Sequence, residues 1–176
     1  AGLMIKVGGV SAVKLEGGVE IVKQVKKIVG AGIPVMGHVG LTPQSINVFS
    51  GHRAQGKDLA SAQKILDDAR ALENAGAFSI VLECVPSELS KYITDSLSIP
   101  TIGIGAGVHC NGQIQVYHDL LGLIGGFNPK HGKKYVNLNK DISHALKQYV
   151  KEVSSKKFPS SKHSIHYKTN IINQLK

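Results

Sequence analysis

Hydrophobic and polar residues follow two different periods along this chain. Apolar residues that recur every three or four positions predict amphipathic helices at 19–29, 58–74, 86–97, 116–124 and 140–153. Short apolar runs, rich in branched residues and bounded by glycine or proline, predict strands at 11–16, 33–38, 78–83 and 99–104. Strands and helices therefore alternate through the first two thirds of the sequence.

This alternation is typical of an α/β protein with a parallel sheet and right-handed crossovers. Four strand–helix units occupy roughly half the length of an eight-unit barrel, which typically needs about 250 residues. The pattern predicts either an open sheet or a barrel that lacks some of its strands. We expect residues 1–153 to form this body and residues 154–176 to be a basic, disordered tail.

Chemically active side chains stand where the predicted strands end. Lys14 and Glu16 share one face of the first strand, because alternate residues of a strand point the same way. His38 ends the second strand, Glu83 ends the third, and the glycine-rich loop 103–107 follows the fourth. Since parallel strands end at the same edge of a sheet, we expect these groups to face one crevice.

Each of these residues also has a purely structural interpretation. Lys14 and Glu16 could form a solvated surface ion pair, which contributes little to stability. His38 could be a core histidine with both nitrogens satisfied, and Glu83 could accept hydrogen bonds from the helix that Pro86 begins. The glycine loop is not a dinucleotide-binding fingerprint, because no helix start or acidic residue follows at the required spacing.

Charge and composition narrow the function further. The net charge of +9 is concentrated in residues 154–176, where five lysines and no acidic residues leave only +4 on residues 1–153. With 5% aromatic residues and no recognition motif, we expect no nucleic-acid partner. We also expect no membrane partner, because no apolar run approaches the length that crosses a bilayer. Cys84 and Cys110 have no metal or disulfide spacing, which favours a reducing compartment.

The tail contains one further motif, His163 and His166, three residues apart. This spacing could serve a metal on a helix, but such pairs more often lie in a solvated basic segment, which is the interpretation we favour here.

Four segments together resemble the ketopantoate hydroxymethyltransferase family. They lie in order at residues 13–18 (VKLEGG), 37–45 (GHVGLTPQS), 82–86 (LECVP) and 102–107 (IGIGAG). The resemblance runs from about residue 12 to 153, and it implies a (β/α)8 TIM barrel of the phosphoenolpyruvate-mutase type. It implies transfer of a one-carbon unit from 5,10-methylenetetrahydrofolate to 3-methyl-2-oxobutanoate, giving 2-dehydropantoate on the route to pantothenate and coenzyme A. A bacterial member is expected in the cytoplasm, a eukaryotic one in the cytoplasm or mitochondrion.

The resemblance also implies roles for four residues. Glu16 matches a carboxylate of a Mg²⁺ site, Lys14 and His38 match substrate-binding residues, and Glu83 matches the catalytic proton acceptor. Removal of the carbon-3 proton would give an enolate that Mg²⁺ and Lys14 stabilise. The resemblance further implies that the chain binds the small-molecule substrate 3-methyl-2-oxobutanoate and assembles into a homo-oligomer.

Members of this family carry additional β/α units, with two aspartates of the magnesium site, ahead of the segment that matches residues 13–18. We therefore expect residues 1–176 to correspond to the carboxyl-terminal portion of the barrel and to have weak or no activity in isolation. Two alternatives stay open. The chain could be an inactive remnant that serves as an oligomerising scaffold, or it could be a related magnesium-dependent lyase of 2-oxo acids.

Overall fold

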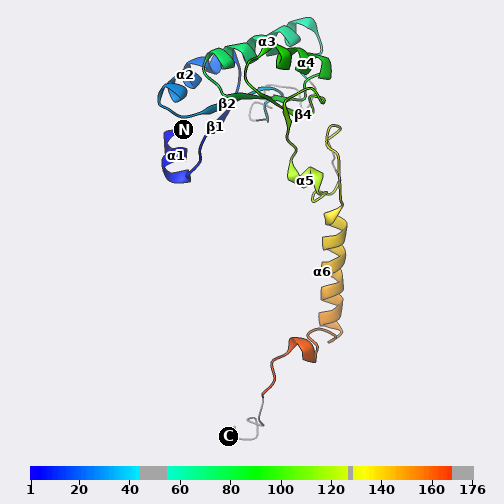
Figure 1. Cartoon of the computed structure of the whole chain (residues 1–176). Helices are drawn as coiled ribbons and strands as arrows, with labels where there is room; N and C mark the ends of the chain where they lie inside the picture. The colour runs from blue at the N-terminus through cyan, green and yellow to red at the C-terminus, as the bar shows by residue number, and fades with distance from the viewer. Residues whose placement is uncertain (44–54, 127–128, 168–176) are drawn as a thin grey trace. The chain divides into compact units, whose positions relative to one another are not determined.

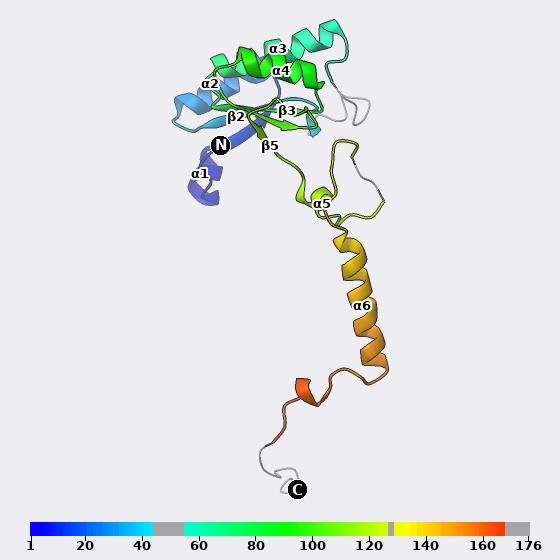
Figure 2. The same ribbon diagram turned by 45° about the vertical axis from the view of Figure 1, so that its right-hand side comes forward.

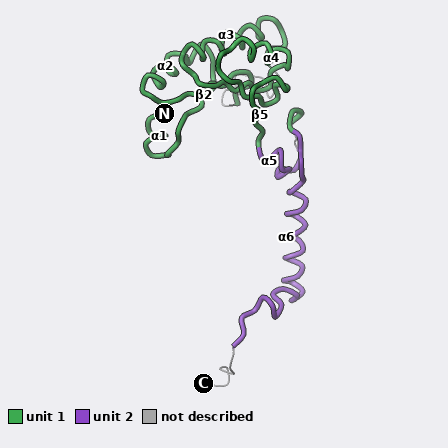
Figure 3. The backbone as a smooth tube through the Cα atoms, in the orientation of Figure 1, with its two compact units in different colours: residues 1–116, 129–132 green, residues 117–128, 133–176 purple. Residues whose placement is uncertain are grey.

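The computed structural model describes residues 1–43, 55–126 and 129–167. These residues fall into two compact units, shown in Figure 3: unit 1 comprises 1–116 and 129–132, and unit 2 comprises 117–128 and 133–176. The predicted body of residues 1–153 is thus divided between the two units. The predicted disorder of 154–176 stays a prediction, since 168–176 lie outside the described residues.

Unit 1 contains a five-stranded parallel sheet in which the strands follow their order in the sequence. The strands are β1 (Val13–Glu16), β2 (Val35–Gly40), β3 (Ser79–Glu83), β4 (Thr101–Ile104) and β5 (Gly112–Gln113). A parallel sheet in sequential order is the arrangement of neighbouring strands in a β/α barrel. The α/β prediction is therefore confirmed, and the sheet is consistent with part of such a barrel.

The helices of unit 1 lie mainly on one face of this sheet. They are α1 (Gly2–Gly8), η1 (Val19–Ile21), α2 (Val22–Gly30), α3 (Leu59–Asn74) and α4 (Ser87–Ser96). In Figures 1 and 2, α2, α3 and α4 form one layer over the strands, whereas α1 lies apart from that layer. The pattern did not predict α1, which has no buried residue.

The longest helix of unit 1 starts with a well-formed cap. Asp58 is the N-cap of α3, where its carboxylate accepts a hydrogen bond from the Ser61 N–H at 2.9 Å. The hydroxyl oxygen of Ser61 in turn accepts a hydrogen bond from the Asp58 N–H at 3.3 Å. Such a capping box satisfies backbone donors that the first helical turn leaves unpaired. The helix predicted at 58–74 is confirmed.

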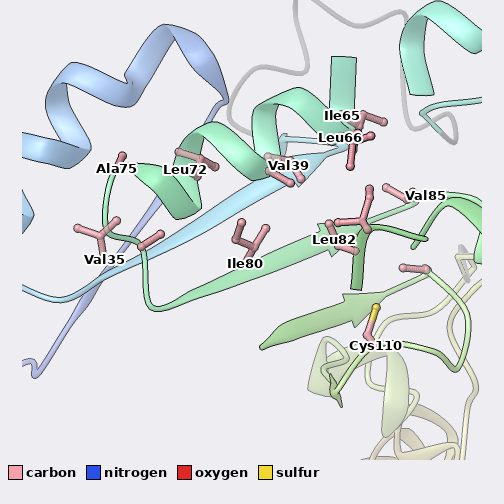
Figure 4. Packing of buried hydrophobic residues seen from close by; sticks show 14 of the residues in the cluster. Val35, Val39, Ile65, Leu66, Leu72, Ala75, Ile80, Leu82, Val85 and Cys110 are labelled. Atoms are coloured by element: carbon pink, nitrogen blue, oxygen red, sulfur yellow. The ribbon is translucent and has the colours of Figure 1, made fainter. Parts of the chain in front are cut away.

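Alternating strand residues build the core between α3 and the sheet. Leu72 from α3 and Ile80 and Leu82 from β3 belong to one apolar cluster and are fully buried (Figure 4). Gly37 of β2 also faces this layer, because a Cβ added there would lie 2.8 Å from Leu72 Cδ1. This face of the sheet is therefore apolar and close-packed. The residues that alternate with these along each strand point to the opposite face.

Unit 2 contains α5 (Tyr117–Leu120), α6 (Leu138–Ser154) and the short η3 (Ser161–His163). The helix predicted at 116–124 is only one turn long. It ends before Gly122, which adopts a positive φ of 61° and where an added Cβ would lie 2.5 Å from the carbonyl oxygen of Val136. The helix predicted at 140–153 is confirmed by α6, which buries no residue among those described. No described helix has the length and apolar character needed to span a membrane.

Candidate active site

Three predicted site residues meet at the carboxyl edge of the sheet. Glu16 ends β1 and pairs directly with His38 of β2, while Glu83 ends β3 and pairs with Gly40. Because Gly40 is two residues beyond His38, all three side chains belong to the face opposite the α3 layer. The strand register thus places a histidine between two glutamates.

The imidazole of His38 lies between the two carboxylates. Its Nδ1 is 3.5 Å from Glu16 Oε1, and its Nε2 is 3.1 Å from Glu83 Oε2. The three side chains are 2%, 8% and 15% exposed, respectively, for His38, Glu16 and Glu83. Neither ring nitrogen makes a hydrogen bond of good geometry with the described residues, despite these short distances. The predicted meeting of these groups is confirmed, and their catalytic roles stay predictions.

The buried position of His38 bears on its structural interpretation. A histidine kept only for packing is expected to have both nitrogens hydrogen-bonded, because an unsatisfied buried polar atom is costly. His38 instead has two carboxylates in ion-pair range without hydrogen-bond geometry. This arrangement is typical of a site whose polar atoms are directed at a ligand.

Lys14 lies on the same face of β1 but outside this group. It pairs with Met36, two residues before the Glu16–His38 pair, and its side chain is exposed. Among the residues that the structure describes, no acidic side chain forms an ion pair with Lys14. The surface ion pair with Glu16 is therefore not formed, and the ammonium group faces solvent at the edge of the site.

The structural alternative for Glu83 is not realised either. The next helix, α4, begins at Ser87 after the N-cap Pro86, and none of the described side chains caps it. Glu83 instead lies 3.1 Å from His38. Its carboxylate is thus directed across the strands toward the imidazole.

The sequence did not reveal a contact between a thiol and a second histidine beside Glu83. Cys84 has a positive φ of 52°, and its Sγ lies 3.6 Å from Nδ1 of His131. Burial, and then the charge of Glu83, raise the pKa of the Cys84 thiol above its ordinary value. The only signal in the sequence was the position of this cysteine directly after a strand-end carboxylate.

The glycine loop after β4 serves packing within the chain. A Cβ on Gly105 would lie 2.8 Å from Cγ of His131, and one on Gly107 would lie 2.1 Å from Oγ of Ser87. Both glycines also have positive φ values. A cavity of about 550 Å³ adjoins this loop; it is lined by Val85, Pro86, Ser87, Gly105, Gly107, Gln113, Gln115 and His131.

The histidines of the tail are bound to serines. His163 Nδ1 lies 2.9 Å from Ser160 Oγ, and His166 Nε2 lies 3.1 Å from Ser161 Oγ. Within the described ranges, no set of three or more histidine, cysteine or acidic residues has the arrangement of a metal centre. The structure thus shows local hydrogen bonds for both histidines, and the metal interpretation of the pair is not tested.

Comparison with known proteins shows which family this sequence matches. The model of the family described as ketopantoate hydroxymethyltransferase matches residues 1–161. The chain belongs to this family. Its match extends over the sheet, the Glu16–His38–Glu83 group and α6.

Individual relatives carry the same description. The 3-methyl-2-oxobutanoate hydroxymethyltransferase of Carboxydothermus hydrogenoformans is 56% identical over 175 residues, covering 99% of this chain and 63% of the relative. Those of Clostridium botulinum (strain 657 / Type Ba4) and Dehalococcoides mccartyi (strain ATCC BAA-2266 / KCTC 15142 / 195) are 53% and 55% identical, covering 99% and 100% of this chain. The chain spans 62% to 64% of the length of these relatives.

Proposed function

We propose that this chain contributes part of the active site of a hydroxymethyltransferase. The enzyme transfers one carbon from 5,10-methylenetetrahydrofolate to 3-methyl-2-oxobutanoate and produces 2-dehydropantoate, a step toward pantothenate. The observation that carries the proposal is the buried His38 held between Glu16 and Glu83 at the carboxyl edge of a parallel sheet. Catalytic groups of β/α barrels occupy this edge.

Glu83 is the proton acceptor in this proposal. Its carboxylate is mostly buried, yet at 15% exposure it remains open to a substrate on one side. The proton on carbon 3 of 3-methyl-2-oxobutanoate is acidified by the neighbouring keto group. Glu83 takes this proton, and the electron pair of the broken C–H bond forms the enolate.

His38 and Lys14 bind and orient the substrate. The imidazole of His38 lies beside Glu83 and can donate a hydrogen bond to a substrate oxygen. The exposed ammonium of Lys14, on the same strand face as Glu16, can pair with the substrate carboxylate. Carbon 3 of the enolate then attacks the methylene carbon of the folate. Over the whole reaction that carbon loses its two bonds to folate nitrogens and gains one C–C bond to the substrate and one C–O bond to an oxygen from water, and tetrahydrofolate leaves with its nitrogens protonated.

Glu16 supplies a ligand suited to Mg²⁺. Magnesium in enzymes is commonly held by one or two carboxylates, with substrate oxygens and water completing its shell. Glu16 provides one such carboxylate at the strand end, 8% exposed, and a 2-oxo acid brings two more oxygens. When bound, the cation withdraws electron density from the keto group and so acidifies carbon 3.

A chimeric enzyme tests this proposal. The chain replaces the matched 175 residues of the Carboxydothermus hydrogenoformans relative, and formation of 2-dehydropantoate is measured with Mg²⁺ and 5,10-methylenetetrahydrofolate. We expect turnover by the chimera and, at most, weak turnover by residues 1–176. A folded chimera without turnover would contradict the proposal and favour the inactive scaffold.

The same assay distinguishes the alternative lyase. A lyase of 2-oxo acids would cleave its substrate in the absence of any folate, whereas the transferase requires 5,10-methylenetetrahydrofolate for net reaction. Exchange of the carbon-3 proton with solvent, without cleavage, would favour the transferase.

Two further features belong to the same proposal. A homo-oligomer is supported by the exposed apolar side chains of α6, among them Leu146 at 60% and Val150 at 60% exposure. Sedimentation of the chimera and of this chain would test it. A cytoplasmic location, or a mitochondrial one in a eukaryote, is the natural place for a reaction that depends on reduced folate.

A further inference from the structure

The turn that follows Glu16 is held by a side chain from α3. The backbone N–H of Val19 donates a hydrogen bond to Oδ1 of Asp68 at 3.0 Å, across 49 residues of sequence. Asp68 is 7% exposed and lies in the middle of α3. A buried carboxylate thus connects the main helix of unit 1 to the segment directly after a candidate metal ligand.

The fit between this carboxylate and the turn is close. A Cβ on Gly18 would lie only 2.0 Å from both Cγ and Oδ1 of Asp68, which no side chain could tolerate without displacement. The second glycine of the VKLEGG segment is therefore required for the approach of Asp68. Gly18 is thus needed for the contact with Asp68 as well as for ending the strand.

Each oxygen of Asp68 has its own partner. Oδ1 accepts from Val19, and Oδ2 lies 2.6 Å from Nζ of Lys64, one helical turn earlier. Burial lowers the pKa of Lys64, but its hydrogen bond to Asp68 and the charges of Asp68 and Glu20 outweigh this and raise the pKa. The lysine remains charged and compensates the buried carboxylate, so that both oxygens of Asp68 are fixed in direction.

The same turn is tied to the candidate active site on its other side. The backbone N–H of Gly17 donates to the carbonyl of His38 at 3.1 Å, and the two residues form an isolated antiparallel bridge. Glu16, whose Oε1 is 3.5 Å from Nδ1 of His38, comes directly before this turn. A shift of the turn would therefore move the Glu16 carboxylate relative to the imidazole.

We infer that Asp68 is a positioning residue for Glu16: it holds the turn after β1 so that the Glu16 carboxylate stays against His38. The inference rests on the proposed function in that Glu16 serves there as a metal ligand. Nothing in the immediate sequence of Glu16 identifies Asp68, which is 52 residues away.

The test observes the imidazole of His38 by ¹⁵N NMR in this chain, without substrate or metal. The His38 signals are assigned by their loss in His38→Gln, and Glu16→Gln defines how they move when the neighbouring carboxylate is neutralised. We expect Asp68→Ala to shift the signals most of the way toward those of Glu16→Gln. Asp68→Asn retains an oxygen for the Val19 N–H and is expected to stay close to the wild type.

Asp67→Ala is the matched control. It removes the same charge from the adjacent position of α3, but Asp67 is exposed and its carboxylate accepts a hydrogen bond from Gln63 at 2.8 Å. We expect its His38 signals to match the wild type. Equal shifts in Asp67→Ala and Asp68→Ala, or no shift in a folded Asp68→Ala, would overturn the inference.

A second variant covers the case in which Asp68→Ala does not fold. Val19→Pro removes the N–H that Asp68 accepts, and the 57% exposed side chain of Val19 makes this a mild change for packing. The same shift of the His38 signals is expected, and a folded Val19→Pro with wild-type signals would overturn the inference. Because this readout needs no turnover, an inactive chimera would contradict only the proposed function.

Discussion

The two faces of the sheet in unit 1 both bury side chains, but the surroundings of those side chains differ. Val39 and His38 are neighbours in β2 and are equally buried, at 2% and 1% exposure. Val39 belongs to the apolar core with α3, whereas His38 lies between the carboxylates of Glu16 and Glu83. Burial by itself thus does not distinguish a core from an active site; the chemistry of the neighbouring strands does. Changes on the first face should affect stability, and changes on the second should affect catalysis.

The largest effect on stability is expected from the apolar face. Leu72→Ala removes a fully buried side chain that packs over Gly37 and should lower the free energy of unfolding by about 2–5 kcal/mol. Leu59→Ala, on the same helix but 85% exposed, is the control and should change it by at most about 0.5 kcal/mol. Urea unfolding of this chain followed by circular dichroism measures both. Equal losses would contradict the assigned core.

On the polar face, Glu16→Gln should impair catalysis while leaving the fold intact. In the chimera we expect turnover to fall about 100-fold at limiting Mg²⁺ and to recover partly at high Mg²⁺, because a neutral amide binds the cation more weakly. The unfolding midpoint should stay near the wild-type value. An unchanged Mg²⁺ dependence would show that Glu16 is not a metal ligand.

A polar contact on the helix side should affect stability in a pH-dependent way. Oε1 of Glu73 accepts hydrogen bonds from the N–H and hydroxyl of Ser98, at 2.6 and 2.7 Å. Burial raises the pKa of Glu73, but these bonds and that from Ile99 outweigh it, so the pKa lies below its ordinary value of 4.5. The stabilisation is therefore present above pH 4.5 and is lost as pH falls through the lower folded value.

Unfolding of Glu73→Gln over a pH series measures this contribution. The variant should be less stable than the wild type by about 1 kcal/mol at pH 7, a value reduced by solvent screening, and the difference should shrink in acid. Glu88→Gln, on the exposed surface of α4, controls for the loss of charge. A difference that grows in acid would contradict the assigned hydrogen bonds.

The smallest predicted effect concerns the thiol of Cys84, whose pKa depends on the charge of Glu83 on the polar face. Because Glu83 contributes to the raised pKa of Cys84, Glu83→Gln should lower that pKa and speed alkylation of Cys84 by iodoacetamide a few-fold at pH 8. Mass spectrometry separates this site from the buried Cys110. Slower alkylation in the variant would show that Glu83 does not raise the pKa.

Much of unit 1 could be predicted because its elements carry strong local periods. The sequence predicted that Glu16, His38 and Glu83 would meet. This prediction needs only the alternation of side chains along each strand and the fact that parallel strands end at the same edge of a sheet. The same reasoning predicted that Lys14 would join them, whereas its side chain lies two residues earlier on β1 and outside the group. The two-residue β5, Gly112–Gln113, is too short to produce a period.

The contacts that escaped prediction join residues far apart in sequence. Cys84 meets His131 across 47 residues, and Asp68 reaches Val19 across 49. Such pairs depend on how loops and helices close over the sheet, which no local pattern records. The α6 pattern illustrates a related limit, because it predicted a helix correctly but not what its apolar side chains contact.

Exchange of the carbon-3 proton of 3-methyl-2-oxobutanoate in D₂O tests the central claim most directly, because it isolates the step assigned to Glu83. In the chimera with Mg²⁺, we expect Glu83→Gln to slow this exchange by about 10²- to 10⁴-fold, while the exposed control Glu88→Gln leaves it unchanged. Exchange at the wild-type rate in a folded Glu83→Gln chimera would contradict the account.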